Sequence, residues 1–109
     1  MSAYDPNYIL PVTKLTLGQL ERFIHLGEEC GEVIRALGKI ERHGLFDRDP
    51  SLPASPDNKE HLEIELRDVI SAALRLARHS DINLDLKNIE DGLPEWWERK
   101  KRFFHFQEL

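Results

Sequence analysis

Two groups of acidic residues have a spacing that suits a divalent metal. Glu28, Glu29 and Glu32 lie in one five-residue run, and Glu65 and Asp68 lie three residues apart in a second run. Residues three or four apart are neighbours on the surface of a helix. If two helices carry these runs side by side, Glu29, Glu32, Glu65 and Asp68 face one another, and carboxylates that close need a compensating charge. A bound cation would supply it.

The ligand atoms of this group indicate the kind of metal. Carboxylate oxygens favour Mg²⁺, with Mn²⁺ as the alternative, over zinc or copper. Mg²⁺ in proteins is usually shared between carboxylates and substrate phosphates, which points to phosphoryl transfer or phosphoanhydride hydrolysis. The competing interpretation is an ordinary solvated helix surface, which suits Glu28 and Glu32 on the polar side of their helix. Glu65 borders an apolar stripe, where a partly buried carboxylate needs a partner.

Other site chemistries lack their motifs. A di-iron bundle needs Glu-x-x-His on two helices, and none of the five histidines has a glutamate three residues before it. P-loop, dinucleotide and zinc-finger spacings are also absent from the sequence. We therefore interpret the histidines as surface or partner contacts. Cys30 falls on an apolar helix face and is interpreted as a small core residue.

The first acidic run lies in a helix predicted over residues 16–42. Thr16 with Gln19 matches a capping box, and His43-Gly44 should end the helix. Its apolar sector covers more than half of the circumference, which predicts contact with more than one neighbour. Three glycines in this sector predict the close approach of another helix or of a ligand: Gly27, Gly31 and Gly38.

The second acidic run lies in a helix predicted over residues 57–79. Asp57 with Glu60 gives a second capping box. The Pro-rich residues 43–58 form a connecting loop, which is long for so small a domain and is typical of a functional lid or a mobile connection.

The two ends of the chain carry weaker patterns. Residues 1–15 are predicted to be an extended arm because two prolines interrupt them. A short helix is predicted over residues 83–91, and Pro94 suits the first turn of an aromatic C-terminal helix over residues 93–109. No strand-like alternation competes, so the sequence predicts an all-α fold of about four helices with a long antiparallel pair at its centre.

Composition limits the function classes. The 109 residues fit one domain, and a net charge of −5 argues against a nucleic-acid binder. No stretch approaches the roughly 20 apolar residues of a membrane span. A single cysteine and an N-terminus without a signal pattern favour a cytoplasmic protein. A core this modest favours association with further copies of the chain.

The two acidic runs carry a family resemblance. Residues 26–33 and 65–70, followed by Leu76 and Ala77, resemble the E-E-x-x-E and E-x-x-D motifs of the MazG-like all-α nucleoside triphosphate pyrophosphohydrolases. The resemblance covers roughly residues 16–86. It implies Mg²⁺-dependent cleavage of a nucleoside triphosphate between the α and β phosphates, giving a monophosphate and pyrophosphate. It also implies a homodimer or homotetramer.

The resemblance implies roles for particular residues. The metal ligands would be Glu29, Glu32, Glu65 and Asp68. Glu28 would be the catalytic residue that orients or deprotonates the attacking water. The candidates for the base pocket, which fit a plain core equally well, are Leu20, Phe23 and Ile24.

The chain also departs from the family pattern. The connection between the motifs is long, and Asp91 and Glu95 stand where the family tends to have a lysine and an asparagine. Lys87 and Lys100 are candidates to replace that phosphate contact. Two alternatives stay open: a non-catalytic helical oligomer or adaptor, and a related phosphoribosyl-nucleotide pyrophosphatase.

Overall fold

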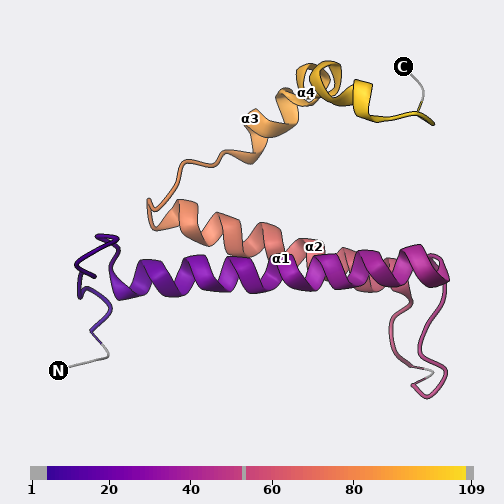
Figure 1. The fold of residues 1–109 in the computed structure, drawn as a ribbon, viewed down its shortest axis with the longest axis horizontal. Coiled ribbons are helices and arrows are strands. Elements are labelled where there is room, and N and C mark those ends of the chain that lie inside the picture. The colour runs from indigo at the N-terminus through magenta and orange to yellow at the C-terminus, as the bar shows by residue number, and fades with distance from the viewer. Residues whose placement is uncertain (1–4, 53, 108–109) are drawn as a thin grey trace.

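The computed structural model describes residues 5–52 and 54–107, and every regular element in these ranges is a helix (Figure 1). Helices α1 (Leu17–His43) and α2 (Asn58–Arg78) are long, and α3 (Leu86–Asp91) and α4 (Leu93–Lys100) are short. A 3-10 turn, η1 (Lys101–Phe103), follows α4. The predicted all-α class with four helices is confirmed.

Helices α1 and α2 form the centre of the structure. Figure 1 shows them side by side and running in opposite directions, as predicted. Their contact buries Ala36 of α1 together with Ala72 and Leu76 of α2. None of the helices in the described ranges is long and apolar enough to cross a membrane.

A charged clamp fixes one end of this helix pair. Arg22 of α1 donates from Nε to Asp81 Oδ2 at 2.6 Å and from Nη2 to Oδ1 at 3.1 Å. Gln19 Nε2 donates to the same carboxylate at 3.2 Å. The Asp81 side chain is only 2% exposed, and the hydrogen bond from Arg22 holds the pKa of Asp81 below its ordinary value. The clamp sets how α1 is rotated against α2.

The helix ends follow the local signals. Gln19 N donates to Thr16 Oγ1 at 3.0 Å and Thr16 N donates to Gln19 Oε1 at 2.9 Å, so the predicted capping box is confirmed. Asp57 Oδ1 accepts from Glu60 N at 2.9 Å, which is one half of the second predicted capping box. Gly44 ends α1 with a φ of 88°, a left-handed conformation that favours glycine.

The N-terminal segment differs from the extended arm predicted over residues 1–15. Residues 1–4 lie outside the described ranges, and residues 5–16 fold back in turns. Leu10 N donates to Leu15 O at 2.8 Å, and Leu17 N donates to Tyr8 O at 2.9 Å. These main-chain bonds hold the segment in its folded-back path and satisfy polar groups that an extended arm would leave to solvent.

The C-terminal segment, residues 85–107, also differs from its prediction. Helix α3 begins only at Leu86, because the Asp85 side chain caps it by accepting from Lys87 N and Asn88 N. The predicted helix over residues 93–109 is wrong beyond Lys100 within the described residues. There the chain passes through η1 and becomes extended at Phe104, whose ring packs 5.1 Å from the ring of Trp97.

The structure is open. Helices α3 and α4 make no contact with α1 or α2 among the described residues, and Figure 1 shows them projecting away from the helix pair. The radius of gyration is 18.4 Å, against about 13 Å for a compact domain of this length. The accessible surface is 8910 Å², an excess of about 2,700 Å² over a compact monomer of this size.

Much of the apolar sector of α1 is exposed and contributes to this large accessible surface. Ile34 is 70% exposed. A Cβ added at Gly27 or Gly31 would meet nothing within 4 Å, and Cys30 is exposed. The prediction of Cys30 as a core residue is therefore wrong within one chain. The sector is open because α2 packs on a different face of α1, and no other described element covers it.

Candidate metal centre

Three carboxylates from the two long helices converge. Glu29 of α1 and Glu65 and Asp68 of α2 each offer one oxygen, and these three oxygens lie within 4.8 Å of one another. We call these residues the carboxylate cluster. Glu65 and Asp68 share one face of α2 because they are three residues apart. Glu29 reaches them because it is seven residues from Arg22 and from Ala36, which both lie on the α1 face toward α2.

The cluster is partly covered. The side chains of Glu29 and Glu65 are 19% and 14% exposed, and Asp68 is exposed. The partial burial of Glu65 agrees with its position beside the apolar stripe. The donor set consists only of oxygens and is open on the Asp68 side, which fits a hard cation that keeps water or phosphate ligands.

Two histidines flank the cluster in the same way. His25 Nε2 lies 3.1 Å from Glu29 Oε1, and His61 Nε2 lies 3.2 Å from Glu65 Oε1. In both helices the histidine precedes its glutamate by four residues, which places the two side chains one turn apart on one face. Such a contact orients a metal-binding carboxylate. His25 is exposed, as interpreted from the sequence, and the sequence interpretation did not include the contacts of His25 and His61 with the cluster.

A sequence signal for these histidines exists. His-x-x-x-Glu occurs in both helices at the glutamate that enters the cluster. The di-iron motif Glu-x-x-His has the opposite order and an interval of three residues, so it does not describe these pairs. The repeated four-residue spacing is therefore the pattern that identifies both contacts.

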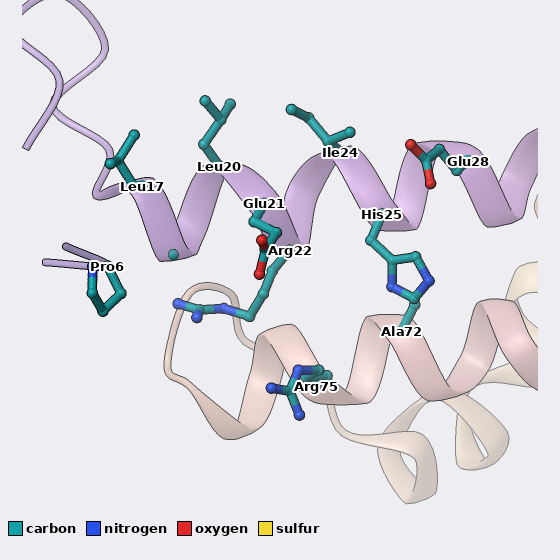
Figure 2. Close-up of a pocket in the computed structure, with 11 residues that line it drawn as sticks. Pro6, Leu17, Leu20, Glu21, Arg22, Ile24, His25, Glu28, Ala72 and Arg75 are labelled. Carbon is teal, nitrogen blue, oxygen red and sulfur yellow. The ribbon is translucent and has the colours of Figure 1, made fainter. Parts of the chain in front are cut away.

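The other two predicted glutamates lie outside the cluster. The Glu32 Oε2 atom lies 3.2 Å from Arg35 Nη1, on a side chain that is 40% exposed. Glu28 lies along the edge of α1 that also carries Ile24, whereas His25 points toward Ala72 of α2 (Figure 2). In the single chain, α1 therefore contributes one cluster ligand, Glu29, where the sequence predicted two.

An open cavity of about 790 Å³ lies beside the cluster, near the start of α1. We call it the N-terminal cavity. Figure 2 shows Leu20 and Ile24 pointing away from α2, and Arg22 and His25 pointing toward it. Of the predicted base contacts, Leu20 and Ile24 line this cavity, and Phe23 is not among its lining residues. Glu28 also lines it, so this glutamate faces the cavity and not the cluster.

The two predicted phosphate contacts lie on the C-terminal segment. Lys87 Nζ pairs with Asp91 Oδ2 at 3.2 Å on α3, and Lys100 Nζ lies 5.7 Å from the centre of the Phe103 ring. Since α3 and α4 do not contact the helix pair, one chain does not bring either lysine to its own cluster.

Comparison of the chain with protein-family models, with curated proteins and with solved structures gave no match. The features of the chain that bear on its function are the carboxylate cluster, the neighbouring cavities and the spacing of the two acidic motifs.

Proposed function

We propose that this protein is a Mg²⁺-dependent nucleotide pyrophosphohydrolase of the MazG-like kind, which cleaves a (deoxy)nucleoside triphosphate to the monophosphate and pyrophosphate. One observation carries the proposal: carboxylate oxygens of Glu29, Glu65 and Asp68 lie within 4.8 Å of one another on two helices. These residues belong to the E-E-x-x-E and E-x-x-D motifs, so sequence spacing and geometry support the same site.

The residues of the site have distinct proposed roles. Glu29, Glu65 and Asp68 hold Mg²⁺, with Mn²⁺ as a substitute, and the ion neutralises charge on the phosphate oxygens. His25 and His61 hold two of these carboxylates in place. Glu28 faces the N-terminal cavity and is proposed to accept the proton of the attacking water. Glu32 is proposed to support the metal in one of two ways. Its side chain could leave the ion pair with Arg35 and turn toward the cluster, or another copy of the chain in the oligomer could bring Glu32 closer to the metal.

The N-terminal cavity is proposed to hold the nucleoside. It combines the apolar side chains of Leu20 and Ile24 with the guanidinium groups of Arg22 and Arg75. Apolar walls with a few convergent polar groups are the usual composition of a small-molecule site. The volume of about 790 Å³ lies within the range of such sites.

The active form is proposed to be a cytoplasmic homodimer or homotetramer. The excess surface of about 2,700 Å² exceeds the roughly 800 Å² that each partner buries in an interface of standard size. The exposed apolar sector of α1, which includes Ile34, supplies the surface that such an interface needs. Another copy of the chain would also provide a surface on which the C-terminal segment could pack.

Pyrophosphate release tests the reaction. Unmodified and modified dNTPs, NTPs and a phosphoribosyl nucleotide are incubated with the protein in Mg²⁺ and in chelator. We expect Mg²⁺-dependent release from at least one triphosphate and its loss in Glu65→Gln. Glu63→Gln is the matched control, because Glu63 lies on the same helix and pairs with Lys59 at the surface, 4.0 Å away. Absence of metal-dependent release from every triphosphate would exclude this reaction.

The second candidate is a non-catalytic helical oligomer or adaptor. The exposed apolar sector of α1 and the projecting C-terminal segment favour it, because both suit binding to another protein chain. It predicts the same oligomer without turnover and no effect of Glu65→Gln on any metal response. A phosphoribosyl-nucleotide pyrophosphatase keeps the site and changes the substrate, so activity on that member of the panel alone would identify it.

A further inference from the structure

A second cavity lies on the other side of the carboxylate cluster from the N-terminal cavity. It has a volume of about 510 Å³ and lies between the last turns of α1, the described residues 44–52 and 54–57 of the connecting loop, and the start of α2. We call it the loop cavity. Its charged and histidine side chains are Lys39, Arg42, His43, Asp47, Arg48, Asp49 and His61.

Main-chain hydrogen bonds hold the loop that forms one wall. Asn58 N donates to Asp47 O at 2.9 Å, and Lys59 N donates to Leu45 O at 2.8 Å. Asn58 Nδ2 also donates to Gly44 O at 3.0 Å. These bonds close the base of the loop against the start of α2, so the wall has a defined position relative to the helices.

The cations and the acids of this cavity are used differently. Asp49 is bound within the loop, because Ser51 N and Ser51 Oγ donate to its Oδ1 at 2.9 and 2.7 Å. These bonds hold the pKa of Asp49 below its ordinary value. Lys39 and Arg42, which lie one turn apart on α1, have no carboxylate oxygen within 4.0 Å among the described residues. The charge of Lys39 also lowers the pKa of Asp49, after the two bonds from Ser51, so Lys39 lies near this carboxylate without forming an ion pair with it. The cavity thus has two cations outside ion pairs, Lys39 and Arg42.

His61 connects the loop cavity to the cluster. It lines the cavity, and its Nε2 lies 3.2 Å from Glu65 Oε1. His25 makes the equivalent connection on the other side, since it lines the N-terminal cavity and contacts Glu29. The N-terminal cavity combines apolar side chains with Arg22 and Arg75, and the loop cavity is lined by cations that include Lys39 and Arg42. The cluster lies between the two cavities along the helix pair, an order that suits a ligand with a nucleoside at one end and phosphates at the other.

We propose that the loop cavity binds the pyrophosphate part of the substrate, the β and γ phosphates, and holds it after cleavage as the leaving group. Lys39 and Arg42 are the residues that bind it, because charged N–H donors form their strongest hydrogen bonds with phosphate oxygens. This inference rests on the proposed function. It gives the long connecting loop a role as the wall of a phosphate subsite.

Binding of inorganic pyrophosphate, measured by calorimetry on the full chain, tests the proposal. The measurement is made with Mg²⁺ and again in chelator, where the cluster cannot recruit pyrophosphate through a metal. The test variant is the double substitution Lys39→Gln with Arg42→Gln. Arg42→Lys retains the charge. Lys59→Gln is the matched control, because Lys59 adjoins the loop but does not line the cavity.

We expect the double substitution to weaken pyrophosphate binding roughly tenfold or more, with nucleoside monophosphate binding unchanged. Arg42→Lys should keep most of the affinity and Lys59→Gln all of it. Failure of the unsubstituted chain to bind pyrophosphate, or equal affinity in the double variant, would overturn the proposal. If the double variant loses its helical circular dichroism, Lys39→Gln alone replaces it, with a smaller loss expected and equal affinity again contradicting the proposal.

The outcome is separable from that of the proposed reaction. Absence of turnover on every triphosphate, combined with pyrophosphate binding that the double substitution weakens, would exclude the hydrolase and retain the loop cavity as a pyrophosphate site. Turnover that depends on Mg²⁺, with a KM that the double substitution leaves unchanged, would retain the hydrolase and exclude the loop cavity as its phosphate subsite.

Discussion

Both the helix pair and the C-terminal segment contain many charged residues, but the contacts of these residues differ between the two regions. In the helix pair, charged groups that are far apart in sequence meet, as Arg22 of α1 does with Asp81 just after α2, and as Glu29 of α1 does with Glu65 of α2. In the C-terminal segment the ion pairs join near neighbours at the surface, as between Lys87 and Asp91. Exposed pairs of the second kind contribute little to stability.

This difference indicates that the helix pair and the C-terminal segment have different functions. The helix pair brings chemical groups together within one chain, so it contains the candidate metal centre and both cavities. Helices α3 and α4 of the C-terminal segment make no contact with the pair among the described residues, and apolar side chains of this segment are exposed, with Leu93 at 50% and Phe103 at 61%. These exposed apolar side chains are the kind of surface that binds another protein chain.

The largest expected effect is on association. Ile34→Asp places a charge at the exposed apolar sector of α1, and burying that charge in an interface is costly. We expect complete loss of the oligomer at micromolar concentration, measured by light scattering after size-exclusion chromatography. Val12→Asp is the control, because Val12 is 91% exposed in the N-terminal segment. An unchanged oligomer in Ile34→Asp would show that this sector of α1 is not the interface.

The next effect is on the clamp of the helix pair. Arg22→Gln removes the charged donor of Asp81 and should lower the melting temperature near neutral pH, more than Arg35→Gln does on the exposed face of α1. Because the pKa of Asp81 is held below its ordinary value, the clamp stabilises fully above about pH 4 and is lost as the pH falls further. Thermal unfolding at a series of pH values measures this. A difference that stayed constant down to acid pH would contradict the assignment.

The smallest effect concerns the C-terminal segment. Lys87 is 84% exposed and pairs only with Asp91 of its own helix in the described chain. We expect Lys87→Gln to change kcat/KM by no more than about twofold, with Arg42→Gln as the comparison in the loop cavity. A tenfold loss in Lys87→Gln would instead show that the C-terminal segment of another copy reaches the cluster.

The sequence predicts the fold where local signals determine it. Thr16 with Gln19, and Asp57 as the cap of α2, place both long helices to within about a residue, because capping depends on neighbours in the chain. The end of α4 is different. The contact between Trp97 and Phe104 competes with continuation of the helix, and no local pattern gives the strength of such a contact.

The residues of the candidate site also fall into those that local sequence predicts and those that depend on contacts between helices. Glu65 and Asp68 could be paired from their spacing alone, since both lie on α2. The choice between Glu29 and Glu32 depends on how α1 is rotated against α2, and that rotation follows from the Arg22–Asp81 clamp and the packing of Ala36. Neither contact is encoded in the acidic motif. The histidine contacts could have been found from the spacing of four residues in both helices.

The central claim is that Glu29, Glu65 and Asp68 hold a divalent cation. A ligand that binds only the folded state raises the melting temperature by mass action, so thermal unfolding with and without millimolar Mg²⁺ tests it directly. We predict a rise for the unsubstituted chain and for Glu63→Gln, no rise for Glu29→Gln or Glu65→Gln, and a reduced rise for Glu32→Gln. A rise that Glu65→Gln retains in full, or no rise in the unsubstituted chain, would contradict the metal centre.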